Sequence, residues 1–191
     1  YAYDDRWNRM SIDTFFKRRV IRLHPMVIMG SIIGALFFFL QKSPCFPNMD
    51  NVSVGTVLII MLYGCTLLPL PLKWDIRGWT EMHPLNGPAW SLYYEYIGNI
   101  LYALFVRKFN KVALSILVFL AACATLHLCL TAPNGDIVGG WALNWEQQYV
   151  GFVRLLYPFF AGLLLSRLGW LIRVKKRAFW WCSLMIVIVL S

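Results

Sequence analysis

Apolar residues run through most of the chain in long stretches, which short polar or basic segments separate. Five stretches approach the roughly 20 residues that a helix needs to cross the hydrocarbon core of a bilayer. They cover residues 20–40, 52–72, 88–106, 112–130 and 150–168, and a sixth begins near Phe179. Lipid offers no partner to backbone N–H and C=O groups, and no alternation typical of a membrane barrel is present. The pattern therefore predicts an all-α, polytopic integral membrane helical bundle.

Basic residues beside the stretches predict the orientation of the chain. Arg18 and Arg19 precede the first stretch and Arg22 lies at its mouth, while Arg107 and Lys108 follow the third. Short basic loops stay in the cytoplasm, so both clusters should lie on that side. Three full crossings between them would put Arg107 on the opposite side. One segment is therefore expected to cross incompletely.

The region of residues 67–90 is the expected exception. Four prolines and two glycines break its helical pattern, namely Pro69, Pro71, Pro84, Pro88, Gly78 and Gly87. We predict a broken or re-entrant element here. Irregular backbone at membrane depth persists only where protein or a wet cavity lines it, so this region is also predicted to form the wall of a site.

Composition supports the membrane class. Hydrophobic residues make up 59% of the 191 residues and charged residues 14%, whereas soluble domains average about 45–50% and about 25%. The net charge of +9 is spread over short clusters between apolar stretches, which indicates cytoplasmic loops and no nucleic-acid partner. The five cysteines show no ligand spacing, so neither a metal site nor a disulfide framework is expected.

Residues 1–191 are expected to form a single membrane-embedded domain, because neither a linker nor an internal repeat divides them. The chain opens without an initiator Met and closes inside an apolar stretch. We therefore expect a fragment that is truncated at both ends.

The first candidate site is the basic cluster Arg18, Arg19 and Arg22. On a helix these side chains share one face at the membrane boundary. The planar guanidinium pairs phosphate oxygens bidentately, so the cluster suits a polyphosphate ligand. A purely topological or headgroup-anchoring role is the alternative.

The second candidate site begins at Pro88, which suits the first turn of a helix. At about 100° per residue, Ser91 and Glu95 fall on one side of that helix. An intramembrane carboxylate is costly and therefore a functional candidate, as base, orienter of a base, or partner of an arginine. The alternative is a structural ion pair of Glu95 with Arg19, Arg22 or Arg154.

Three residues near this helix start are predicted to contact a substrate. His83 and Asn86 lie in the suspected broken element, and Trp90 precedes Ser91 directly. For His83 a role in capping the loop is the alternative.

Together the two clusters resemble the acyltransferase-3 family. The first motif is carried by Phe16, Arg18, Arg19, Arg22, Leu23 and Pro25, and the second by Trp90, Ser91, Leu92 and Glu95. The resemblance covers residues 13–105 closely and the later stretches only by hydropathy. Its two motifs are weak singly, and their order and spacing make it fairly specific.

The resemblance implies a multi-pass enzyme of the bacterial cytoplasmic (inner) membrane that acylates envelope glycans, most often with acetyl groups. Acyl-CoA would be the donor substrate, without a permanently bound cofactor, and a glycan or lipid-linked glycan the acceptor. Arg19 and Arg22 would bind the donor, and Ser91 and Glu95 would lie in the acceptor or transfer region. The family's catalytic His candidate would precede Tyr1, so the fragment alone is expected to be inactive.

Two other functions are compatible with these features. Broken helices and intramembrane charge also occur in secondary transporters, with Glu95 and Arg154 as a coupling pair. The helices could also form a noncatalytic membrane subunit that only binds a partner.

Overall fold

Helices are the main secondary structure of the described part of the chain, and loops connect them. The computed structural model describes residues 7, 10–41, 43–132, 136–169 and 178–190. These residues hold six α-helices, which are α1 (Ile12–Phe37), α2 (Val54–Gly64), α3 (Ala89–Leu104), α4 (Lys111–Thr131), α5 (Trp145–Leu168) and α6 (Ala178–Leu190). Pairing of extended backbone in the same residues is limited to one isolated bridge, between Glu81 and Ala142. The predicted all-α membrane bundle is thus confirmed.

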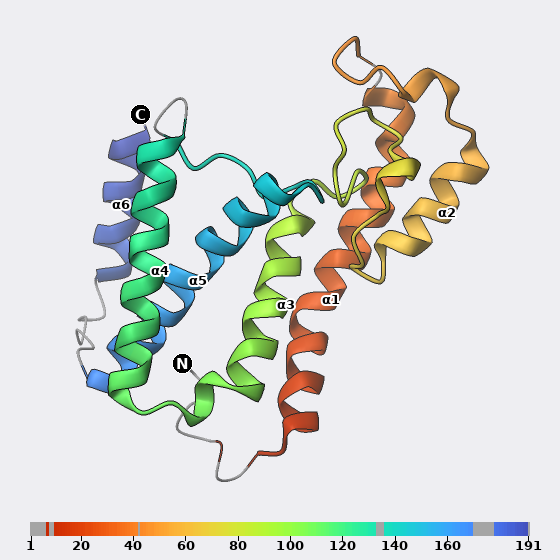
Figure 1. The fold of residues 1–191 in the computed structure, drawn as a ribbon. Coiled ribbons are helices and arrows are strands. Elements are labelled where there is room, and N and C mark those ends of the chain that lie inside the picture. The colour runs from red at the N-terminus through yellow and green to blue at the C-terminus, as the bar shows by residue number, and fades with distance from the viewer. Residues whose placement is uncertain (1–6, 8–9, 42, 133–135, 170–177, 191) are drawn as a thin grey trace.

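The helices stand side by side in a row. Contacts join α4 to α5, α5 to α3, α3 to α1 and α1 to α2, which is the order seen across Figure 1. Among the described residues, three helices are long and apolar enough to cross a membrane: α1 extended to Gln41, α4 and α5. The helix α3 has 16 residues, or about 24 Å at about 1.5 Å per residue.

Short polar side chains fix where the helices begin. Ser11, Ser53, Asn110 and Asn144 each accept a hydrogen bond from the backbone N–H three residues later. Such caps satisfy donors that the first helical turn leaves without a partner. At the other end of α5, Gly169 takes the left-handed conformation with φ of 76°, which a glycine adopts at little cost.

The predicted second span over residues 52–72 is wrong as a full crossing. Its helix, α2, contains 11 residues and ends at Gly64. Leu67 then has a positive φ of 62°, and Pro69 and Pro71 cannot donate hydrogen bonds to an α-helical ladder. At about 1.5 Å per residue α2 is about 16 Å long, roughly half of the hydrocarbon core.

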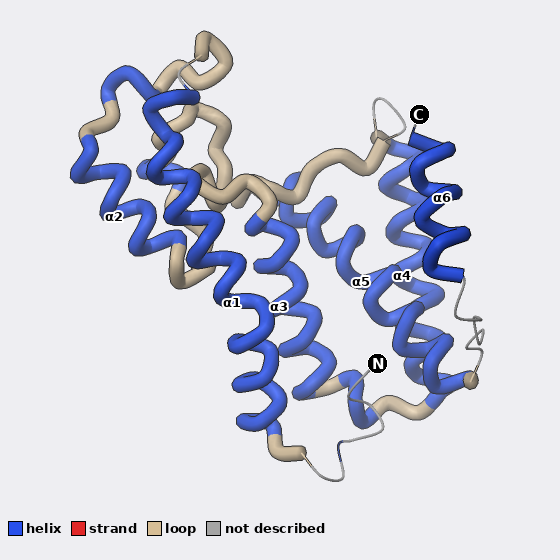
Figure 2. The backbone as a smooth tube through the Cα atoms, turned by 180° about the vertical axis from the view of Figure 1, so that it is seen from behind, coloured by secondary structure: helices blue, strands red, loops and turns tan. Residues whose placement is uncertain are grey.

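The chain between α2 and α3 turns back on itself. A Cβ added at Gly64 would lie 3.3 Å from the Ser31 hydroxyl, so α2 ends beside the second half of α1, before it has run the length of that helix. The following segment, residues 65–88, contains only the short turn η4 (Leu72–Trp74) as helix and loops back before α3 begins (Figure 2). The predicted broken or re-entrant element is therefore present, and it removes the excess crossing.

The irregular segment of residues 65–88 packs against α1 at two glycines. A Cβ added at Gly30 would clash with the Asn86 side chain, and one at Gly34 with the backbone of Leu85. Small residues four apart let another backbone approach a membrane helix closely. The irregular segment thereby lies directly on α1 and leads into α3, whose Ala89 packs with Val27.

Candidate active site

An open groove of about 470 Å³ lies between α3 and α5. Its α3 wall is formed by Trp90, Ser91, Tyr94 and Glu95, and its α5 wall by Gly151, Arg154, Leu155, Pro158 and Phe159. Three residues predicted from the sequence as catalytic or substrate-binding therefore share one wall of this groove. They are Trp90, Ser91 and Glu95.

Glycines let the two helices approach closely at the groove. A Cβ added at Gly151 would overlap the ring of Tyr94, and one at Gly98 would lie 2.9 Å from a methyl carbon of Leu155. A larger side chain at either position would require the facing side chain, Tyr94 or Leu155, to shift. Gly151, which lines the groove, thus lets the Tyr94 ring of the opposite wall lie against α5.

Glu95 forms an ion pair with α1. Its Oε1 lies 3.6 Å from Nη1 of Arg19, and the side chains are 37% and 13% exposed, respectively. Of the three arginines that the sequence offered as partners for Glu95, the structure selects Arg19. The pair joins the basic cluster of α1 to the groove wall of α3.

The other two arginines of the cluster are solvent- or lipid-accessible. Both Arg18 and Arg22 are exposed, and the Arg18 guanidinium lies 4.0 Å from the Met10 sulfur. The cluster is therefore divided. Arg19 is held against α3, while Arg18 and Arg22 present their charge outward.

Arg154 belongs to the opposite wall of the groove. Its Nη1 donates a 2.8 Å hydrogen bond to the Gly139 carbonyl, and its guanidinium carbon lies 4.6 Å from the centroid of the Trp90 ring. Pro158, four residues later, cannot donate to the Arg154 carbonyl as a helical residue would. The groove thus contains one cation on α5 and one carboxylate on α3.

Ser91 and Asn99 complete the polar side of α3. The Ser91 hydroxyl donates to the Pro88 carbonyl at 2.8 Å, so its proton is directed to the backbone. The fully buried Asn99 donates from Nδ2 to the Glu95 carbonyl at 2.7 Å. Among the described residues, the hydroxyl of Ser91 and the Nδ2 of Asn99 both donate to backbone carbonyls of their own helix start or helix.

His83 and Asn86 lie away from this groove. His83 is buried and borders a small cavity of about 10 Å³, together with Ser31 and Asn86. Asn86 donates to the Val27 carbonyl at 3.4 Å. Burial lowers the pKa of His83, which lies outside the membrane-spanning helices, to about 4, so its imidazole is neutral at pH 7.

Some of these features could have been found in the sequence. The spacing Gly30-x-x-x-Gly34 in an apolar stretch is a known signal of close helix contact, and it marks where the irregular segment packs. Tyr94 and Gly151 had no comparable signal, because their contact joins residues 57 positions apart. Among the described residues, no group of His, Cys, Asp or Glu side chains could hold a metal ion.

Comparison with known proteins adds one match. A family model described as an acyltransferase domain (Acyl_transf_3) matches residues 2–191. The search of curated proteins and the search of solved structures gave no match.

Proposed function

This chain belongs to the acyltransferase-3 family, and we propose that it transfers an acyl group, most simply acetyl, from acyl-CoA to a hydroxyl of a cell-envelope glycan. Membership of the family and the apolar helices make it an acyltransferase domain of an integral membrane protein. The donor, the acceptor and a location in the bacterial cytoplasmic membrane are parts of the proposal.

The ion pair between Arg19 and Glu95 is the observation that supports it most. It connects the arginine cluster, which suits the phosphates of a CoA donor, to the groove that contains the other candidate residues. A reaction between a soluble donor and a membrane-side acceptor requires the two binding regions to meet. In this chain they meet at Glu95.

We assign donor binding to Arg18, Arg19 and Arg22. Because Arg18 and Arg22 are exposed, their guanidinium groups can pair phosphate oxygens without first breaking a buried contact. Arg19 would pair with the donor phosphate nearest the groove. In this proposal the thioester end of the donor would extend from the arginine cluster into the groove that Glu95 lines.

In the proposed reaction the acceptor hydroxyl oxygen attacks the thioester carbonyl carbon. The new C–O ester bond forms as the C–S bond breaks, and the hydroxyl proton ends on the CoA thiol. Glu95 would accept that proton or orient the group that accepts it. By the family resemblance, a His preceding Tyr1 would act as the base or as a transient acyl carrier.

Ser91 is assigned to positioning the acceptor. Its hydroxyl proton is engaged by the Pro88 carbonyl, which leaves the oxygen as an acceptor for a sugar hydroxyl. The groove volume of about 470 Å³ falls within the range of about 300–1,000 Å³ that is typical of ligand sites. Trp90 would contribute an aromatic surface, and His83 and Asn86 would support the segment that leads into it.

The test is transfer of label from acetyl-CoA, radiolabelled on the acetyl group, in membranes that express the full-length gene product. We expect label in the envelope glycan of the host. It should be lost with Arg22→Ala and in a host that lacks the glycan. Lys111→Ala, which removes an exposed cation at the start of α4, is the matched control and should retain transfer.

Two results would overturn the proposal. One is confirmed expression without transfer from acetyl-CoA or from a panel of longer acyl-CoAs. The other is unchanged turnover in Arg22→Ala and Glu95→Gln, which would remove the assigned residues from the reaction.

A further inference from the structure

A second groove lies on the other side of α1, between α2 and the turn η4. It has a volume of about 330 Å³ and is lined by Thr56, Ile59, Ile60, Lys73, Trp74, Asp75 and Ile76. We call it the α2 groove. Three isoleucines make its floor apolar, and Lys73 and Asp75 make part of its rim charged.

The short helix α2 presents apolar side chains outward beside this groove. Val54, Leu58, Ile59 and Leu62 are each at least 50% exposed. Since α2 is about half as long as the hydrocarbon core is thick, its length suits about one leaflet of a bilayer.

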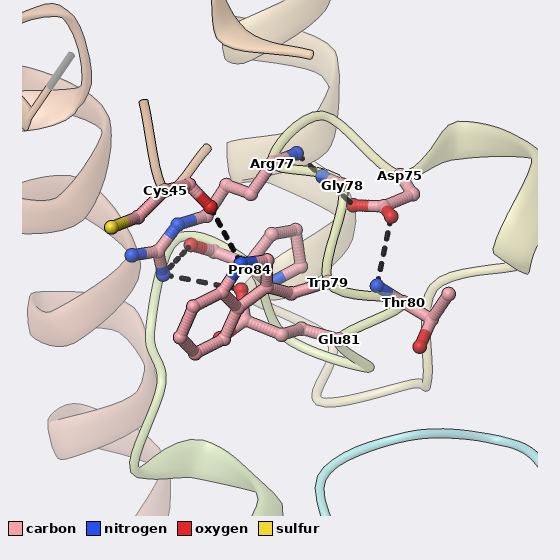
Figure 3. Close-up of polar contacts among 8 residues, drawn as sticks. All are labelled: Cys45, Asp75, Arg77, Gly78, Trp79, Thr80, Glu81 and Pro84. Atoms are coloured by element: carbon pink, nitrogen blue, oxygen red, sulfur yellow. Dashed lines mark hydrogen bonds and ion pairs between the residues drawn. The ribbon is translucent and has the colours of Figure 1, made fainter. Parts of the chain in front are cut away.

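The Asp75 carboxylate accepts hydrogen bonds from the backbone of its own turn. One carboxylate oxygen accepts from the backbone N–H groups of Arg77 and Gly78 at 3.0 and 2.9 Å, and the other accepts from Thr80 at 2.8 Å. Figure 3 shows this carboxylate directed at the turn. These three hydrogen bonds hold the carboxylate against its own turn.

Lys73 has no such acidic partner. Among the described residues, no carboxylate lies within ion-pair distance of its ammonium group, which lies 6.0 Å from the centroid of the Trp74 ring. A Lys and a Trp side by side are typical of the boundary between headgroups and acyl chains. Asp75 shares the rim but its oxygens are held by the turn, so Lys73 is the rim charge available to a ligand above the apolar floor.

The wall that carries Lys73 is held in place by a second set of contacts. The Arg77 guanidinium donates to Glu81 at 3.1 Å and to the Pro84 carbonyl at 3.2 Å, and it stacks on Phe46 at 4.0 Å. Trp79 donates to the Cys45 carbonyl at 2.6 Å, as Figure 3 also shows. The groove is therefore formed before any ligand binds, which lowers the entropic cost of binding.

We propose that the α2 groove binds one anionic phospholipid of the surrounding bilayer. An acyl chain lies against Ile59, Ile60 and Ile76, and Lys73 pairs with the headgroup phosphate beside the Trp74 indole. A lipid bound there anchors the re-entrant segment at a fixed depth. The inference concerns a different face of α1 from the catalytic groove and does not depend on the proposed function.

Quenching of Trp74 fluorescence by brominated lipids tests the site. The emission of Trp74 is obtained as the difference between the wild-type protein and Trp74→Phe, because the chain contains nine tryptophans. The full-length protein is reconstituted with phosphatidylglycerol or phosphatidylcholine brominated on one acyl chain. We expect half-quenching at about fivefold less phosphatidylglycerol, the factor that one Lys contributes at an anionic surface.

Charge variants identify the residue responsible. Lys73→Gln should abolish the preference for phosphatidylglycerol, and Lys73→Arg should keep it. The matched control Lys108→Gln, in the turn that follows the C-terminal end of α3, should keep it too. Equal quenching by both lipids in the wild-type protein would mean ordinary annular lipid and would overturn the proposal. So would a preference that survives in a correctly folded Lys73→Gln protein.

Discussion

Replacing Glu95 by Gln distinguishes a catalytic role of Glu95 from a structural role in which it only holds Arg19. The exchange keeps the shape of the side chain and removes its charge. At 3.6 Å and an effective dielectric constant of about 20, the Coulomb attraction is about 4–5 kcal/mol. Glu95 is 37% exposed, and desolvation and screening offset most of that attraction. We expect a net loss of about 1 kcal/mol in the free energy of unfolding, or about 2–4 °C in melting temperature.

The expected effect on turnover is much larger. If Glu95 receives the proton or orients the base, kcat should fall by about 10²–10⁴-fold, while KM for acyl-CoA should change little. Arg19→Gln should instead raise KM for acyl-CoA, because it removes a phosphate contact. Steady-state kinetics of the purified full-length protein in lipid would measure both constants, and thermal unfolding would measure the stability.

The double variant Arg19→Gln/Glu95→Gln decides between catalysis and scaffolding. Independent roles predict that it combines the kcat loss of one change with the KM increase of the other. The reasoning would be refuted if Glu95→Gln raised only KM, by the same factor as Arg19→Gln, with the double variant no worse than either. Glu95 would then serve only to hold the arginine.

Three further predictions concern packing and pH. Gly151→Ala places a methyl group against the ring of Tyr94 and should lower the free energy of unfolding by about 1–3 kcal/mol. The control Gly162→Ala has no atom within 4 Å of the new methyl and should be neutral or stabilising. Equal shifts of the two variants in thermal unfolding would contradict this. Burial lowers the pKa of His83 to about 4, so the unfolded chain takes up a proton first as the pH falls below 6.5. The free energy of unfolding should therefore fall by about 2 kcal/mol between pH 7.5 and pH 5, and His83→Gln should flatten that part of the profile. Asp75→Ala removes the acceptor of three backbone N–H groups and should destabilise the fold by about 2 kcal/mol or more, seen as a lower melting temperature.

The helices could be predicted from the sequence because hydropathy and capping act locally. The stretches at residues 112–130 and 150–168 correspond to α4 and α5, and four polar caps stand where the helices begin. The second stretch was predicted too long because its apolar residues continue after Gly64. Hydropathy does not register that Leu67 takes a positive φ there, although the positions of the basic residues did indicate an incomplete crossing.

The sequence predicts which site residues share a face of one helix, but it does not predict which residues of different helices meet. Helical periodicity places Ser91 and Glu95 on one side of α3, and the cost of burying charge marks Glu95. The choice of Arg19 over Arg22 and Arg154 as its partner depends on how α1 lies against α3. Likewise, Arg154 lines the same groove as Glu95 without an ion pair between them, because its guanidinium is held by Gly139 and Trp90.

The re-entrant segment explains why these contacts can form. An unbroken second span would return the chain to the basic end of α1, and α3 would then begin at that end and run parallel to α1. Instead the chain turns back at Gly64 and delivers Ala89 beside Val27, so that α3 runs antiparallel to α1 and brings Glu95 level with Arg19. The prolines and glycines of residues 67–90 therefore affect the site indirectly, by breaking the second span. They set the direction of α3, and that direction joins the basic cluster to the groove.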